Sequence, residues 1–169
     1  MSHLIPLMTE VLVAADCWQD EPEAETLIQR AIAAAGEAVD SGGRGAEVAV
    51  LLTDDAGIRK LNLDWRGIDK ATNVLSFPST PSPVCHDAPA APRMLGDIAI
   101  AYETMRREAA EDGKPFDHHL SHLAVHGFLH LVGYDHENDA DAEAMESLET
   151  KILVQLGIPD PYTDRERMD

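Results

Sequence analysis

The chain has 169 residues, of which 44% are hydrophobic and 26% are charged, and 31 Asp and Glu against 13 Lys and Arg leave a formal net charge of −18. A domain of this length buries enough apolar surface to fold without disulfides, so we expect one domain over residues 1–169. The negative charge excludes a broad basic surface that coats DNA or an anionic membrane, and neither partner is expected.

Strand and helix patterns alternate along the chain. Apolar runs between turn signals predict strands at 8–17, 47–53, 73–77 and 97–101. Apolar residues at helical spacing, bounded by capping residues or glycines, predict helices at 20–42, 54–66, 102–112, 117–132 and 139–156. This order predicts an α/β fold in which a small mixed four-stranded sheet is packed by about five helices.

Two segments of this pattern have special features. The second helix carries Ile58, Leu61 and Trp65 at its apolar positions and is closed by Gly67. Residues 78–94 contain five of the ten prolines, which excludes a regular helix or a central strand and predicts a surface loop or a flap over an active site. Cys85, His86 and Asp87 lie in this loop, where three adjacent metal-binding residue types are usually incidental.

The cysteine count and the N-terminal segment indicate the compartment. Two cysteines are too few for a disulfide framework and indicate a reducing environment. The N-terminal segment lacks the cationic start of a secretory signal, and no stretch reaches the ~18 apolar residues of a membrane span. We therefore expect a cytoplasmic protein.

The sequence HGFLHLVGYDH at 126–136 carries the strongest chemical signal. His126 and His130 are four residues apart in a predicted helix, so their side chains project about 40° apart from one face. Gly133 can end the helix in the left-handed conformation, and the returning chain would bring His136 over the same face. Three imidazoles and an open position are typical of catalytic zinc, so we predict one Zn²⁺ ion, although other first-row divalent ions also bind such sites. Ordinary partly buried histidines and a non-catalytic metal clip are the alternatives.

The same spacing occurs in the metzincin proteases, H-E-x-x-H-x-x-G-x-x-H, so we expect a metzincin-like zinc helix. Those proteases use the glutamate after the first histidine as a general base, and Gly127 stands at that position here. Because glycine cannot accept a proton, the pattern weighs against a zinc metalloprotease, which stays an alternative together with other metal-dependent hydrolases.

Three further residues near this motif have open roles. His119 and His122 lie on the same helical stripe as His126. His122 can orient a metal ligand, donate to a substrate oxygen, or face solvent. Asp135 can accept a hydrogen bond from an imidazole, accept a proton from water, or simply form part of a turn.

The motif 126–136 resembles the signature of the YbeY endoribonucleases, H-G-x-L-H-L-x-G-Y-D-H. The segments LNLDWRGIDKATNVLSFP at 61–78 and LGDIAI at 95–100 resemble two further blocks of that family, and the ending LGIPDPY also fits. The resemblance covers most of residues 45–162. It implies a metal-dependent endoribonuclease that prefers single strands, matures ribosomal RNA, notably the 3′ end of the small-subunit RNA, and acts in ribosome quality control. It also implies that His126, His130 and His136 bind the metal, that Arg66 is the family's arginine, and that the partners are ribosomal RNA, the ribosome and ribosome-associated proteins.

These residues suggest a mechanism. Zinc-bound water has a pKa of about 7, so the site can work without a glutamate base. The metal can supply hydroxide to a phosphodiester, or neutralise a phosphate oxygen while a ribose 2′-OH attacks. Either route adds negative charge to the phosphate, and Arg66 is the candidate that binds it, with a solvated helix-end arginine as the alternative.

The net charge opposes an RNA substrate unless the basic residues are concentrated at the site. Arg59, Lys60, Arg66 and Lys70 fall within twelve residues, and we predict that they grip RNA locally. Weak affinity for free RNA and delivery by the ribosome would follow. A ribosome-associated binding module with a structural metal is the remaining alternative.

Overall fold

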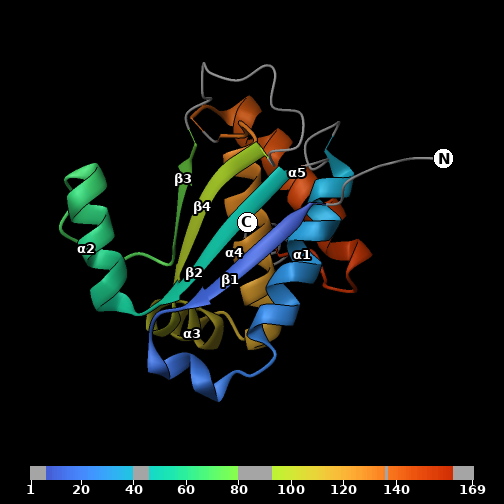
Figure 1. The fold of residues 1–169 in the computed structure, drawn as a ribbon. Coiled ribbons are helices and arrows are strands. Elements are labelled where there is room, and N and C mark those ends of the chain that lie inside the picture. The colour runs from blue at the N-terminus through green and yellow to red at the C-terminus, as the bar shows by residue number, and fades with distance from the viewer. Residues whose placement is uncertain (1–6, 40–45, 80–92, 136, 162–169) are drawn as a thin grey trace.

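The computed structural model describes residues 7–39, 46–79, 93–135 and 137–161. Its sheet contains β1 (Met8–Val13), β2 (Ala46–Thr53), β3 (Val74–Pro78) and β4 (Arg93–Ala101) in the order β1-β2-β4-β3. β1, β2 and β4 run parallel, whereas β3 pairs antiparallel with β4 and forms an edge of the sheet (Figure 1). The predicted small mixed sheet is confirmed.

Five α-helices accompany the sheet in the described part of the chain: α1 (Ala24–Ala38), α2 (Asp55–Arg66), α3 (Tyr102–Glu111), α4 (Phe116–Leu131) and α5 (Asp139–Gln155). Their order along the chain confirms the predicted α/β pattern. The first predicted strand was too long, since it ends at Val13 and a short 3₁₀ helix, η1 (Asp16–Asp20), follows. The reason is Trp18, whose indole N–H donates to the Thr53 carbonyl over 2.8 Å, which requires the chain to leave the sheet and turn inward.

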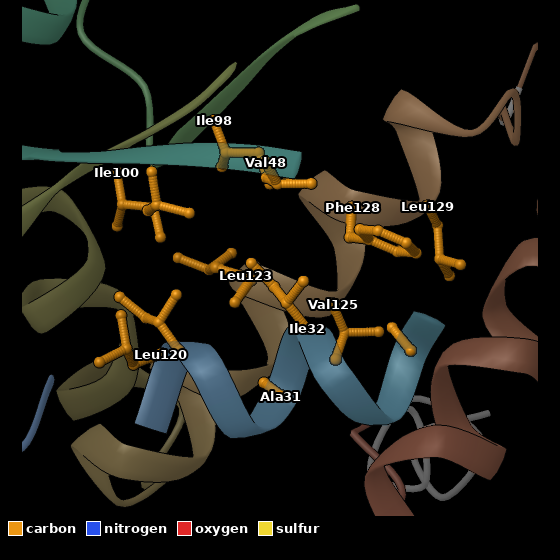
Figure 2. Close-up of a cluster of buried hydrophobic side chains, with 14 of the residues drawn as sticks. Ala31, Ile32, Val48, Ile98, Ile100, Leu120, Leu123, Val125, Phe128 and Leu129 are labelled. Carbon is orange, nitrogen blue, oxygen red and sulfur yellow. The ribbon is translucent and has the colours of Figure 1, made fainter. Parts of the chain in front are cut away.

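The main core lies between one face of the sheet and the helices α1 and α4. Alternate residues of the two central strands, such as Val48 and Ile98, point toward Ile32 of α1 and Phe128 of α4 (Figure 2). Each fully buried side chain of this kind contributes roughly 1.5–3 kcal/mol relative to exposure. Ten residues of α4 are buried, so the helix runs through the middle of the protein. Its histidines are therefore held on a rigid, central element.

The opposite face of the sheet is covered less completely. Ile58 of α2 packs there with Leu75, Ala99 and Ala101, but Trp65 near the end of the helix is 72% exposed. In Figure 1, α2 projects away from the other helices, beyond the edge strand β3. Of the three apolar residues that the sequence places on this helix, Ile58 is buried and Leu61 is half-buried against the sheet, whereas Trp65 lies beside Phe77 and stays largely exposed.

Both predicted ends of α2 are confirmed. The Asp54 side chain accepts a hydrogen bond from the Gly57 backbone N–H over 2.8 Å, and Gly67 adopts φ = 72° at the C-terminus. A side-chain cap of this kind contributes about 1 kcal/mol to stability. The left-handed glycine ends the helix directly after Arg66, which fixes where that side chain lies.

Residues 80–92 lie outside the described residues, as do Cys85, His86 and Asp87. The predicted loop 78–94 is bounded differently in the structure, because Pro78 ends β3 and Arg93 begins β4. In the part of the chain that the structure describes, no helix is long and apolar enough to cross a membrane.

Candidate metal centre

Two histidines of α4 bring their ring nitrogens close together, as the helical spacing predicts. The Nε2 atoms of His126 and His130 are 3.1 Å apart, and the ring centroids are 4.6 Å apart. Two nitrogens that bind one tetrahedral zinc ion at 2.0–2.1 Å lie about 3.3 Å from each other. The spacing of these two donors therefore fits a shared metal ion.

A carboxylate from α5 holds the first of these rings. His126 Nδ1 lies 3.2 Å from Oε2 of Glu149, and His122 Nε2 lies 2.7 Å from Oε1 of the same group. With Nδ1–H donating to the carboxylate, the Nε2 atom of His126 keeps the lone pair that a metal requires. This carboxylate–imidazole pair is typical of ligands in zinc proteins.

Glu149 is completely buried, and its ionisation is maintained by the two histidines. Burial alone would raise its pKa, but the hydrogen bonds and charges of His122 and His126 outweigh burial and lower the pKa of Glu149 to about 2. The carboxylate is therefore present as an anion at neutral pH.

Sequence reasoning missed Glu149, although a signal was present. It follows Met145 by four residues and precedes Ile152 by three, so it belongs to the buried face of α5. An acidic residue in register with buried apolar positions indicates a polar partner on the neighbouring helix. That partner is α4, with which α5 packs.

The third predicted ligand, His136, lies outside the described residues. Among the residues that the structure does describe, no set of three or more His, Cys, Asp or Glu side chains is arranged to hold a metal ion. The described part of the candidate centre is therefore a pair of neighbouring imidazoles with one supporting carboxylate. These residues fit a zinc ion by donor type and spacing.

Gly127 packs against the sheet and leaves no room for a side chain. A Cβ atom at this position would lie 2.9 Å from Ile98 Cγ2 and 3.3 Å from Ser76 Oγ. The Ser76 hydroxyl also donates to the Gly127 carbonyl over 3.0 Å. The position at which metzincins carry a catalytic glutamate is thus used here to bring α4 close to β3 and β4.

A cleft of about 650 Å³ opens beside the histidine pair. It is lined by residues of α2, β3, α4 and the turn after α4, including Arg66, Asn73, Ser76, His126, His130 and Asp135. Arg66 and His126 are sixty residues apart in sequence and meet at this cleft. The structure thus brings the predicted arginine, two of the predicted ligands and Asp135 together.

The other candidate residues lie elsewhere. Arg59, Lys60 and Lys70 are exposed and do not belong to the described lining of the cleft. The Arg59 guanidinium binds the Asp69 carboxylate through two hydrogen bonds, of 2.6 and 3.1 Å. His122 contacts Glu149 and lines a different cavity, of about 330 Å³.

Comparison with known proteins identifies the family. The family model for endoribonuclease YbeY matches residues 14–157, and an endoribonuclease YbeY of Bradyrhizobium diazoefficiens is 72% identical over 98% of this chain and 90% of its own. One from Bradyrhizobium sp. is 70% identical over 95% of both chains. The chain belongs to the YbeY endoribonuclease family.

The fold is also found in a solved structure. The solution structure of TM1509 from Thermotoga maritima is similar with a TM-score of 0.58 at 26% identity, over 86% of this chain and 87% of the other. The part of this chain that matches the YbeY model includes Arg66, the histidine pair and Glu149. All cleft residues named above therefore lie inside the YbeY match.

Proposed function

We propose that this chain is a single-strand-specific endoribonuclease with one zinc ion bound by His126, His130 and His136. We place its action in the cytoplasm, in the processing of ribosomal RNA at the small-subunit 3′ end and in ribosome quality control, as one metallo-hydrolase domain. Membership of the YbeY family supports the reaction class. The observation that carries the assignment of the site is the meeting of Arg66 with the histidine pair in one cleft.

The histidines and Glu149 form the metal-binding half of this site. His126 and His130 present their Nε2 atoms, while Glu149 fixes the ring of His126 through Nδ1. A zinc ion held there would supply Lewis acidity, which favours ionisation of water and offsets charge on a phosphate oxygen. His136 lies outside the described residues and completes the proposed set.

Arg66 forms the phosphate-binding half. Its position at the end of α2, directly before Gly67, presents the guanidinium to the cleft. A guanidinium binds two phosphate oxygens at once and stays charged at every physiological pH. It would therefore stabilise the charge that builds on the phosphate during cleavage.

Asp135 is the proposed proton acceptor. It is exposed and lines the same cleft as Arg66 and the histidines. A carboxylate at this place can accept the proton of the attacking group, either a water molecule or the ribose 2′-OH. The two routes give different products, because attack by the 2′-OH leaves a 2′,3′-cyclic phosphate that end-group analysis detects.

The test separates metal binding from phosphate binding. Arg66→Ala should lower kcat for a single-stranded RNA about 10²–10³-fold while elemental analysis still finds zinc in the protein. His130→Ala should remove both zinc and cleavage while the fold is largely kept. Arg30→Ala, an exposed arginine of α1 outside the described cleft lining, is the control for loss of a positive charge and should leave kcat unchanged.

Two results would contradict the proposal. If Arg66→Ala cleaves RNA at the wild-type rate, Arg66 does not stabilise the phosphate during cleavage. If the wild-type protein binds zinc, cleaves no RNA and unfolds when His130 is replaced, the metal is structural and the protein is a binding module.

A further inference from the structure

Trp65 is an exposed aromatic residue beside a residue of the cleft. It is 72% exposed and directly precedes Arg66, the proposed phosphate ligand. Consecutive residues of a helix point about 100° apart, so the two side chains serve different surfaces. Exposure of an indole ring to water is unfavourable, so a ligand that covered the ring would gain binding energy from its burial.

Trp65 lines an apolar groove on the face of the sheet opposite to α1 and α4. The groove has a volume of about 480 Å³, and its walls come from β1, β2, α2, β3 and β4. The ring centroids of Trp65 and Phe77 are 6.3 Å apart at an interplanar angle of 56°. The two rings therefore form an aromatic wall that leaves the indole face accessible.

The groove and the cleft share the edge strand β3. Ser76 lines the cleft, the next residue, Phe77, lines the groove, and Pro78 lines both. Successive side chains of a β-strand point to opposite faces, so Ser76 and Phe77 lie on opposite sides of β3. An extended ligand that leaves the cleft over Pro78 would thus enter the groove directly.

We propose that this groove is a base-binding subsite, in which Trp65 and Phe77 bind a nucleobase of the single-stranded RNA whose phosphate is held by Arg66. The inference rests on the proposed function for its substrate. A base offers an apolar π-face that stacks on an aromatic ring, and each stacked base contributes the equivalent of roughly a 5- to 150-fold change in affinity.

The polar residues of the groove suit the edge of a base. Asp97 and Ser79 line it beside the aromatic rings. The Asp97 carboxylate can accept a hydrogen bond from an exocyclic amino group, but it would repel a phosphate. The groove therefore fits the base of a nucleotide, while Arg66 in the cleft fits its phosphate.

This subsite gives a physical reason for a preference for single strands. A base must leave its stack to lie against Trp65, which costs a few kcal/mol in a duplex and much less in a single strand. Every nucleobase has a flat face that can stack on an aromatic ring, so this contact by itself selects no particular RNA sequence.

The chain provides its own optical probe for the test. It has two tryptophans, and Trp18 is 3% exposed with its indole N–H bonded to the Thr53 carbonyl. A ligand in the groove therefore changes the emission of Trp65 and not that of Trp18. The zinc-loaded full chain is titrated with a 2′-O-methyl oligoribonucleotide that is checked to stay intact, and with an abasic oligonucleotide of equal length and charge.

The base-bearing oligonucleotide should quench the Trp65 emission and bind about 5- to 100-fold more tightly than the abasic one. Trp65→Ala should remove this difference, as measured by fluorescence anisotropy of a labelled oligonucleotide, and Trp65→Phe should largely keep it. Arg66→Ala should weaken both ligands by the same factor. Thermal unfolding, followed by the emission of Trp18, reports whether each variant is folded.

Equal affinity for the two oligonucleotides, or unchanged affinity in folded Trp65→Ala, would overturn the subsite. Either result would leave the groove to another occupant, such as a protein segment. If the base-dependent binding is present but the wild-type protein cleaves no RNA, the proposed function fails and the subsite stands. If cleavage is present without base-dependent binding, the subsite alone is wrong.

Discussion

At the scale of single residues, Glu149 has the largest consequence for the site. It is an anion with no exposure to solvent, and it is held by His122 and His126. A buried charge is tolerated where hydrogen bonds satisfy it, and removal of one partner is costly. The same contacts fix the ring of His126 with its Nε2 atom toward His130.

Glu149→Gln should weaken zinc binding about 10- to 100-fold. The glutamine amide has one acceptor oxygen in place of two, so it cannot accept a hydrogen bond from each imidazole in the same way. The measurement is competition with a chromophoric chelator, which needs no activity assay. Glu143→Gln, on the exposed face of the same helix, is the matched control and should keep the wild-type zinc affinity. An unchanged affinity in folded Glu149→Gln would mean that the carboxylate does not position the ligand.

Gly127 is the second residue whose role depends on one contact. A methyl group there would meet Ile98 Cγ2 at 2.9 Å, and a β-branched side chain in a central strand has little freedom to move. We expect Gly127→Ala to lower the free energy of unfolding by about 1–3 kcal/mol despite the better helix propensity of alanine. Urea unfolding measures the change.

The double variant Gly127→Ala/Ile98→Ala tests the cause. It should be less destabilised than the sum of the two single variants, since the second change makes room for the first. Additive effects would show that the loss of stability has another origin. The same crowding explains why the protease glutamate has no place in this helix.

At the scale of elements, one carboxylate links α3, α4 and the start of β3. Glu108 of α3 accepts a hydrogen bond from the Asn73 side chain over 3.0 Å and lies 3.0 Å from His119 Nε2 of α4. Asn73 lines the cleft and its carbonyl accepts from the Ala101 backbone N–H. Glu108 therefore ties the start of the edge strand to the helix that carries the proposed metal ligands.

The stability that Glu108 contributes should depend on pH. Its hydrogen bond with His119, together with that from Asn73 and the nearby Arg107, lowers its pKa below the ordinary value of 4.5 although partial burial opposes this. A group with a lowered pKa in the folded state stabilises the protein above pH 4.5, and this contribution is lost as the pH falls through the lowered value.

Glu108→Gln should thus cost about 1 kcal/mol of unfolding free energy at pH 7, and the gap to the wild type should close as the pH falls below about 4.5. Thermal or urea unfolding at several pH values measures both. Glu111→Gln, one turn later on an exposed position of α3, should show a much smaller effect at every pH. A gap that stays constant with pH would contradict the assigned role of the ionised form.

At the scale of the whole molecule, a net charge of −18 must be reconciled with an anionic substrate. Arg66 is in the cleft, whereas Arg59 is paired with Asp69, and Lys60 and Lys70 lie outside the described lining. RNA binding should therefore depend on a small number of cationic contacts and on the apolar groove, and only weakly on the surface as a whole.

The salt dependence of oligonucleotide binding measures this number. With Arg66 as the single phosphate contact, the slope of log K against log salt should be near −0.7, so affinity should fall about 3-fold between 50 and 200 mM. If Arg59, Lys60 and Lys70 also contact phosphate, the slope should approach −2.8 and the fall should be about 50-fold. The second result would restore the local basic patch that the sequence suggested.

Much of this molecule is determined locally. The types and order of the elements, the cap of Asp54 and the approach of His126 to His130 all depend on residues within one or two turns of each other, so periodicity and spacing were sufficient to predict them. The resemblance of short motifs to the YbeY family, which pointed to Arg66, was likewise carried by contiguous residues.

The tertiary structure decided what those residues meet. Glu149 reaches His126 from a helix more than twenty positions away, Gly127 is required by the approach of Ile98, and Trp65 stays exposed because α2 diverges from the sheet. Each of these depends on how distant elements pack, and periodicity shows which face of an element is buried but not which residues of another element that face meets. The place of Glu149 on the buried face of α5 follows from its spacing, but its histidine partners and the accessible indole of Trp65 could be recognised only after the helices were in place.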